Sequence, residues 1–247
     1  MRRQILNQPI DTLTLEQAVQ LVSNAFTDSK QLRIVTLNPE MIINALISPE
    51  FQSAINNSEL IVPDGTGITW GLKQLDPEHS KDVKRIPGIE LSEDILKIAN
   101  KLSRKVAVFG GKKEVLEKVV SKFQSKYPNI QLVKAVNGYL DKEKYDEVAK
   151  DISSKNPDLV LVALGTPKQE LWVNKYCSLF PKSVMIGIGG SLDVWSGDKM
   201  RAPKWIRNAH LEWLFRLITQ PKRISRVMKS LPVFVYMVLK AKKNNKE

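Results

Sequence analysis

The chain has few of the residues that form cross-links and metal centres. Among its 247 residues there is one cysteine, Cys177, and there are two histidines, His79 and His210. A single cysteine excludes an internal disulfide and a cysteine-rich metal site. The two histidines are far apart in the sequence and do not indicate a histidine-based metal centre. These residues therefore indicate no cysteine-rich or histidine-based metal centre, and we expect no cofactor.

Long apolar segments are also missing. A membrane-spanning helix needs about 18 or more consecutive apolar residues, and the best apolar stretch, Pro232 to Leu239, is far shorter. The N-terminal residues do not resemble a signal peptide. We therefore expect a cytoplasmic protein without a spanning helix.

Basic charge is concentrated at one end of the chain. The net charge is +12, and residues 199–247 hold 13 Lys and Arg against two acidic residues, Glu212 and Glu247. This leaves 25 basic and 24 acidic side chains in residues 1–198. Such asymmetry indicates an anionic partner, either nucleic acid or a lipid surface.

Between these two partners, the residues of the basic segment favour lipid. Its Lys and Arg residues alternate with Trp205, Trp213, Phe215 and Met228, which is typical of a helix lying at an anionic membrane surface. No helix-turn-helix, RRM or zinc-finger pattern supports binding to nucleic acid. The alternative is a helix packed on the core with a solvated basic face.

Continuous apolar runs alternate with helical patterns over most of the chain. This alternation predicts an α/β fold, a doubly wound, Rossmann-like and mainly parallel sheet covered on both faces. A Thr14-x-x-Gln17 capping box opens one helix. The predicted strands are Leu32–Leu37, Leu60–Val62, Lys105–Phe109, Ile130–Val133, Leu159–Leu164 and Val184–Ile188.

Beyond about residue 198 only helical patterns follow, with breaks near Pro221 and Pro232. We therefore predict a catalytic α/β domain over residues 1–198. Residues 199–247 are predicted to form a basic, amphipathic tail of several short helices.

Polar residues and glycines occupy the turns after the predicted strands, where parallel α/β sheets bind ligands. Glycine turns that lead into helices let backbone N–H groups approach a phosphate, which favours a diphosphate-containing ligand. Neither a Walker sequence nor a strict GxGxxG is present, so P-loop and dinucleotide enzymes are disfavoured. The candidate residues are Thr36, Asn38, Asp64, Arg85, Gly110, Gly111, Gly165, Gln169, Gly189, Gly190 and Asp193.

Structural roles compete with functional ones at these positions. Asp64 could be a turn residue, and Thr36 and Asn38 could satisfy backbone groups. Gln169 could be an exposed polar residue of a first helical turn, and Asp193 could cap a turn. Arg85 could be a solvated surface charge.

The motifs in combination resemble the WecG/TagA/CpsF family of bacterial glycosyltransferases, from about residue 5 to about residue 230. Each motif alone is weak, but their order is specific. They are TLNPEMI (36–42), VPDGTGI (62–68), RIPG (85–88), ALGTPKQELW (163–172), GIGGSLDVWSGDKMRAP (187–203), EWLFRL (212–217) and QPKRISR (220–226).

This resemblance implies an enzyme of the cytoplasmic membrane face that acts on lipid-linked precursors of surface polymers. The best-known members transfer N-acetylmannosamine (ManNAc) from UDP-ManNAc to undecaprenyl-diphosphate-linked GlcNAc in wall teichoic acid synthesis. Members are regarded as inverting and metal-independent, and the lack of an Asp-x-Asp motif here agrees with that. Others use UDP-ManNAcA or another donor such as UDP-glucose, and the sequence does not choose among them.

The resemblance also implies residue roles. Asp64 matches the general base that accepts the proton of the acceptor hydroxyl. Thr36, Asn38 and Gln169 match polar residues that orient the sugar and the acceptor. Arg85 is a candidate for stabilising the departing diphosphate, and the tail residues Arg216, Arg223 and Arg226 match basic residues that complete the site.

A tail with these arginines would serve both as a membrane contact and as a part of the active site. Docking on lipid, or a change of oligomeric state, would then bring it over the pocket. A homo-oligomer is a further partner that the sequence leaves open. Outside this family, a non-catalytic membrane-binding protein is the main alternative.

Overall fold

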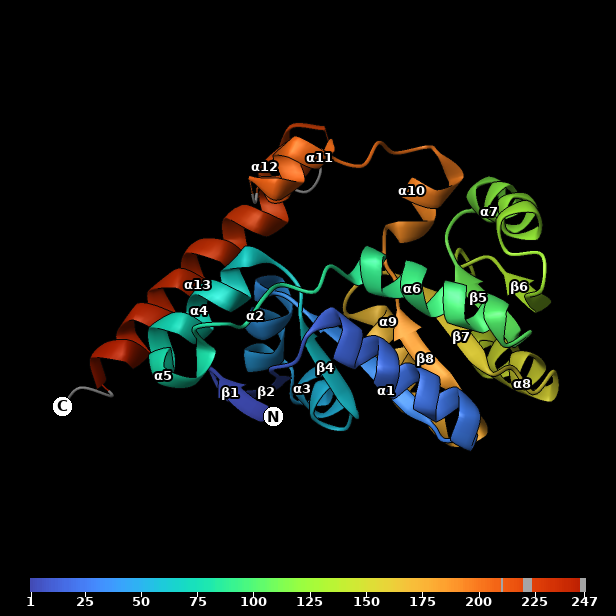
Figure 1. The fold of residues 1–247 in the computed structure, drawn as a ribbon, viewed down its shortest axis with the longest axis horizontal. Coiled ribbons are helices and arrows are strands. Elements are labelled where there is room, and N and C mark those ends of the chain that lie inside the picture. The colour runs from blue at the N-terminus through green and yellow to red at the C-terminus, as the bar shows by residue number, and fades with distance from the viewer. Residues whose placement is uncertain (210, 220–223, 245–247) are drawn as a thin grey trace.

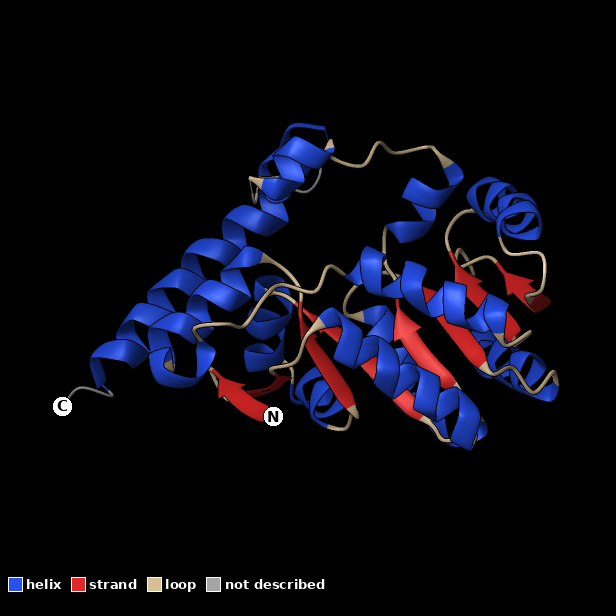
Figure 2. Cartoon of the chain, viewed as in Figure 1, coloured by secondary structure: helices blue, strands red, loops and turns tan. Residues whose placement is uncertain are grey.

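The computed structural model describes residues 1–209, 211–219 and 224–244. Its centre is a six-stranded sheet with the strand order β4-β3-β8-β7-β5-β6, in which all neighbouring strands are parallel (Figure 2). The predicted doubly wound α/β fold is confirmed, and each predicted strand is present within three residues of its expected ends. The strands are β3 (Leu32–Leu37), β4 (Leu60–Pro63), β5 (Lys105–Gly110), β6 (Gln131–Val136), β7 (Leu159–Ala163) and β8 (Val184–Gly187).

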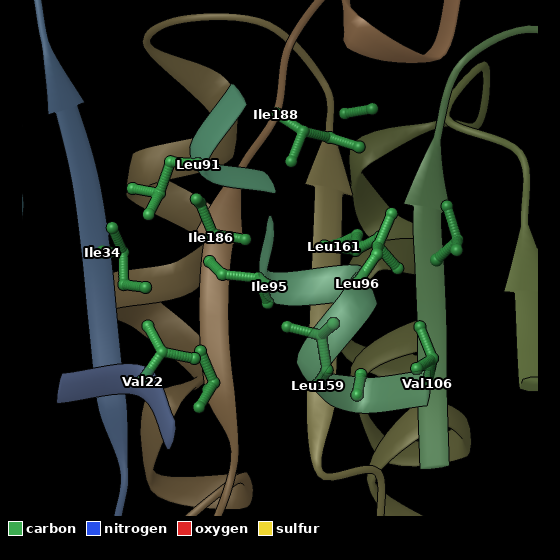
Figure 3. Close-up of a cluster of buried hydrophobic side chains, with 14 of the residues drawn as sticks. Val22, Ile34, Leu91, Ile95, Leu96, Val106, Leu159, Leu161, Ile186 and Ile188 are labelled. Atoms are coloured by element: carbon green, nitrogen blue, oxygen red, sulfur yellow. The ribbon is translucent and has the colours of Figure 1, made fainter. Parts of the chain in front are cut away.

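One face of the sheet is covered by α1 (Leu15–Asp28), α6 (Gly88–Lys101), α7 (Lys113–Lys126) and α10 (Ser191–Ser196) (Figure 1). The predicted capping box opens α1: the Gln17 amide donates to Thr14 Oγ1 at 3.2 Å, and Gln17 Oε1 accepts from the Thr14 amide at 2.9 Å. Ile95 of α6 packs among side chains of several strands (Figure 3).

The other face carries two groups of helices, and short 3-10 turns at Lys142–Lys144 and Cys177–Leu179 complete this layer. Helices α8 (Tyr145–Ser154) and α9 (Lys168–Tyr176) cover the β5, β7 and β8 side, where Phe109 and Trp172 are in contact. On the β3 and β4 side lie the helices that follow those strands. They are α2 (Pro39–Ile47), α3 (Pro49–Asn56), α4 (Thr66–Leu75) and the short α5 (Pro77–Ser80).

An N-terminal antiparallel hairpin, β1 (Arg2–Ile5) and β2 (Gln8–Asp11), was not predicted. Its two turn residues, Leu6 and Asn7, have φ values of 46° and 64°. Glycine and asparagine usually occupy such positions, so a leucine there does not indicate a turn in the sequence. Asp11 attaches the hairpin to the domain, because its Oδ2 accepts from the Ile61 amide at 2.8 Å.

The basic segment forms α11 (Lys204–Asn208), α12 (Glu212–Thr219) and the 21-residue α13 (Ile224–Asn244). The expected break near Pro232 is wrong, since α13 continues through it. Helix α13 packs on α2 and α4, and its Phe234 and Val238 are fully buried in the core beside Leu37 (Figure 1). Part of residues 199–247 therefore belongs to the hydrophobic core.

The length of α13 raises the question of whether it could cross a membrane. Within the described ranges, each helix is too short or too polar to cross a bilayer.

Candidate active site

The first part of the site lies where β3 and β4 end side by side. Thr36 of β3 pairs with Val62 of β4 in the parallel register. The backbone N–H of Asp64 donates to the carbonyl oxygen of Leu37 at 2.8 Å. This bond holds Asp64 directly after β4, next to the carboxyl end of β3, where ligands bind in such sheets.

The segment that carries Arg85 runs along the same edge. The Ile86 amide donates to the Pro63 carbonyl oxygen at 2.8 Å. At Gly88, an added Cβ would lie 3.1 Å from Thr36 Oγ1, so the backbone of Gly88 approaches the Thr36 side chain closely. The structure thus brings Thr36, Asp64 and the Arg85 segment together at one edge of the sheet, and their role in a common site stays a prediction.

Asn38 begins α2 as its N-cap. Its side-chain oxygen accepts a hydrogen bond from the Met41 amide at 3.1 Å, which satisfies one of the free donors of a helix start. The backbone-capping interpretation of Asn38 is therefore confirmed. Its amide nitrogen takes no part in this cap, so the predicted contact with a ligand stays a prediction.

Arg85 forms an ion pair with Glu212 of α12. The Nη2 and Oε2 atoms are 2.6 Å apart, and the two side chains are only 15% and 5% exposed. The alternative of a solvated surface charge is therefore wrong for Arg85. Its predicted role at the diphosphate stays a prediction. In this structure the guanidinium already binds the Glu212 carboxylate.

A second cluster of charges joins the same two parts of the chain. Glu90, in the first turn of α6, pairs with Arg201 and with Arg207, the latter at 3.1 Å. Arg201, Arg207 and Glu212 are thus each paired with a residue of opposite charge in the segment 85–90. Neither Glu90 nor Glu212 was predicted as a site residue, although Glu212 stands out as one of two acids in a basic segment.

The glycine turns occupy the neighbouring ends of β5 and β7. An added Cβ at Gly110 would lie 2.4 Å from the carbonyl carbon of Ala163, so a side chain cannot fit there. The Gly111 amide donates to the Ala163 carbonyl oxygen at 3.1 Å. Helices α7 and α9 then leave these strands toward opposite faces, which is the arrangement that opens a ligand crevice.

Gly165 lies at the start of the turn that leads from β7 into α9. An added Cβ at this position would meet no atom within 4 Å. Open space is therefore shown at Gly165, whereas an added Cβ at Gly111 would lie 3.0 Å from Leu192 Cδ1. The predicted diphosphate contact of Gly110, Gly111 and Gly165 stays a prediction.

The Gln169 side chain points inward. It is 5% exposed, and its Oε1 accepts from the Gly189 amide at 3.0 Å. The alternative of an exposed polar residue in a first helical turn is therefore wrong. Gln169 connects the turn after β7 with the Gly189-Gly190 turn after β8.

Asp193 lies in the first turn of α10, which Gly190 precedes. Its carboxylate forms an ion pair with Lys199, and its carbonyl oxygen accepts from the Lys199 amide at 2.9 Å. These bonds fix the chain that leaves α10 toward the basic segment. A contact of Asp193 with substrate stays a prediction.

The structure describes the three predicted tail arginines only in part. Arg223 lies outside the described residues, as do the side chains of Arg216 and Arg226, although α12 and α13 include these two positions. For metals, the described part of the chain brings no three His, Cys, Asp or Glu side chains together.

The fold and the site define an α/β enzyme with a carboxylate, a paired arginine and glycine turns at the carboxyl edge of a parallel sheet. Residues 3–247 match the model of the glycosyl transferase WecG/TagA/CpsF family. The chain belongs to this family and is a glycosyltransferase, which confirms the resemblance seen in its motifs.

Two relatives cover nearly the whole chain. A Bacillus subtilis (strain 168) protein is 37% identical over 243 residues, 98% of this chain and 93% of the relative. A Staphylococcus aureus (strain NCTC 8325 / PS 47) protein is 38% identical over 245 residues, 98% of this chain and 94% of the relative. Both are named N-acetylglucosaminyldiphosphoundecaprenol N-acetyl-beta-D-mannosaminyltransferase.

Proposed function

We propose that this chain transfers ManNAc from UDP-ManNAc to undecaprenyl-diphosphate-linked GlcNAc, with inversion and without a metal, in wall teichoic acid or related surface-polymer synthesis. The observation that carries the proposal is the similarity to the two named relatives over 98% of the chain. Their names supply the sugar and the acceptor. The motifs that include Asp64, Arg85 and Gln169 lie within the matched residues.

Asp64 is the general base in this proposal. The acceptor hydroxyl attacks the anomeric carbon of the donor and must lose its proton as it does so. A carboxylate within hydrogen-bond distance can accept that proton. The position of Asp64 at the end of β4, fixed through the Leu37 carbonyl and near Thr36, supports this role.

Arg85 and the glycine turns stabilise the departing UDP diphosphate. Positive groups and backbone N–H groups aimed at the developing negative charge lower the barrier of such a step. In this structure a carboxylate, that of Glu212, occupies Arg85 Nη2. This contact with one carboxylate oxygen supports the proposed affinity of the Arg85 guanidinium for anionic oxygens.

The basic segment binds the inner face of the plasma membrane, as a peripheral contact near the lipid-linked acceptor. Exposed apolar side chains on α11, α12 and α13 support this, among them Trp205 at 70%, Ile218 at 74% and Tyr236 at 64% exposure. Exposed apolar groups next to cations such as Lys204 and Lys229 suit the headgroup region of an anionic bilayer. Arg216, Arg223 and Arg226 complete the active site from this segment.

A donor screen tests the proposal. UDP release is measured with UDP-ManNAc, UDP-ManNAcA and UDP-glucose, each with and without a lipid-linked GlcNAc acceptor. Acceptor-dependent release from UDP-ManNAc alone is the expected result. Release from one of the other donors would replace the donor assignment, and no release from any donor would favour the non-catalytic membrane-binding alternative.

A further inference from the structure

The Gln169 amide fits into a space that depends on Gly187. An added Cβ at Gly187 would lie 2.5 Å from Gln169 Nε2 and 2.8 Å from its Cδ. The last residue of β8 therefore has to lack a side chain for Gln169 to reach the turn after β8. There its Oε1 accepts from the Gly189 amide at 3.0 Å.

Glu170 determines which way this amide faces. Gln169 Nε2 donates to Glu170 Oε1 at 2.7 Å, and the same oxygen accepts from Thr166 Oγ1 at 3.3 Å. A flipped Gln169 amide would place two oxygens against each other at Glu170 and two donors against each other at Gly189. Because Glu170 Oε1 is an acceptor, it favours one orientation of the Gln169 amide. In this orientation Gln169 Oε1 accepts the hydrogen bond from the Gly189 amide.

Glu170 is an unfavourable residue for stability alone. The residue is 7% exposed, and its Oε2 has no hydrogen-bond partner among the described residues. Burial, with a smaller contribution from the negative charge of Glu40 on α2, raises its pKa to about 7. A buried carboxyl group with one unsatisfied oxygen costs free energy, and perturbed carboxyl groups of this kind gather at functional sites.

We propose that Glu170 is a positioning residue, which orients the Gln169 amide and thereby holds the turn after β8 against the turn after β7. The inference rests on the proposed function, since these two turns flank the crevice expected to hold the UDP diphosphate. Glu170 acts through Gln169 and touches no substrate. Its Oε1 accepts the two hydrogen bonds in both the ionised and the neutral form.

The test compares two substitutions of Glu170, one that keeps a hydrogen-bond acceptor and one that introduces an apolar side chain of similar size. Glu170→Gln keeps an oxygen for Gln169 and Thr166, so we expect kcat/KM for UDP release within about twofold of the wild type. Glu170→Met removes the acceptor, and we expect roughly a tenfold or larger loss of kcat/KM, with hydrogen exchange at the Gly189 amide accelerated. Glu147→Gln, on the exposed surface of α8, is the control and should change neither readout.

Gly187→Ala gives a second route that leaves Glu170 intact. The added methyl group displaces Gln169, so this variant should lose activity and Gly189 protection as Glu170→Met does. In a Gln169→Ala background it should add almost no further loss, because the clash is then removed. This arm keeps the proposal testable where Glu170→Met fails to fold.

Wild-type activity and Gly189 protection in Glu170→Met would overturn the inference, as would equal losses in Glu170→Gln and Glu170→Met. Additive losses of Gly187→Ala and Gln169→Ala would also contradict it. Because Gly189 exchange is measured without substrate, it reports on the positioning role even where the wild type releases no UDP. Absent turnover with the expected exchange pattern would count against the proposed function alone.

Discussion

Arg85 Nη2 and Glu212 Oε2 lie 2.6 Å apart, although the two residues are 127 positions apart in the sequence. The pair joins the loop before α6 to α12, at the edge of the sheet where Asp64 and Thr36 lie. The basic segment is therefore attached to the candidate active site by a largely buried ion pair.

We expect the Arg85–Glu212 pair to couple these two segments in stability. Glu212→Ala removes a carboxylate from a nearly buried guanidinium and should lower the free energy of unfolding by about 3 kcal/mol. Arg85→Ala should also destabilise, and the double variant should lose clearly less than the sum of the two. Urea unfolding of the four proteins measures this coupling, and additive losses would show that the pair contributes nothing.

Asp64 provides the prediction for catalysis. Asp64→Asn keeps the size and the backbone bond of the residue but cannot accept the proton of the acceptor hydroxyl. We expect turnover to fall by roughly 100-fold or more, while the affinity for UDP, measured by calorimetry, stays within about twofold. Asp94 lies on α6, where it forms an ion pair with Lys97, and Asp94→Asn serves as the control. Near-normal turnover of Asp64→Asn would place the base elsewhere.

Glu170 provides a prediction for pH dependence. Its ordinary pKa of 4.5 rises to about 7 in the folded protein because of burial. Between these two values the folded state holds a proton that the unfolded state has lost, so this group makes stability fall as pH rises through that range. Glu170→Gln removes this contribution.

Unfolding free energies of the wild type and Glu170→Gln are therefore compared at about pH 5 and about pH 8. The variant should gain relative to the wild type at the higher pH, by at most on the order of 3 kcal/mol. Glu147→Gln is again the control. Parallel pH profiles of wild type and Glu170→Gln would contradict the raised pKa.

The exposed side chains of the basic segment provide a prediction for membrane binding. Trp205→Ala combined with Ile218→Ser removes two large apolar groups that are 70% and 74% exposed. We expect roughly tenfold weaker binding to vesicles rich in phosphatidylglycerol. Tyr139→Ala, an aromatic residue that is 73% exposed next to β6, should bind as the wild type does. Equal vesicle binding of the wild type and both variants would contradict the prediction that this surface binds the membrane.

Much of the fold could be predicted because its strands are buried on both faces. Runs such as Leu159–Leu164 are apolar throughout and end at a glycine turn, a pattern that few other structures produce. The hairpin could not be seen, since Leu6 takes a left-handed conformation that leucine rarely adopts. Helix α13 continues through Pro232 because burial of Phe234 and Val238 outweighs the lost backbone hydrogen bond.

The site could be predicted as a set of turns and only partly as a set of contacts. The position of Asp64 follows from the strand that precedes it. The partners of Arg85 and Glu90 are set by tertiary packing between segments far apart in the chain, which local patterns do not encode. Glu212 was visible as an acid in a basic segment, yet nothing local indicated its partner.

The most direct test of the proposed function is the identity of the lipid product. Wild-type protein is incubated with UDP-ManNAc and a lipid-linked GlcNAc diphosphate, and the lipid is analysed by mass spectrometry beside an Asp64→Asn reaction. The account predicts one added N-acetylhexosamine on the acceptor with the wild type and almost none with Asp64→Asn. An unchanged acceptor with the wild type, or equal product from both proteins, would contradict it.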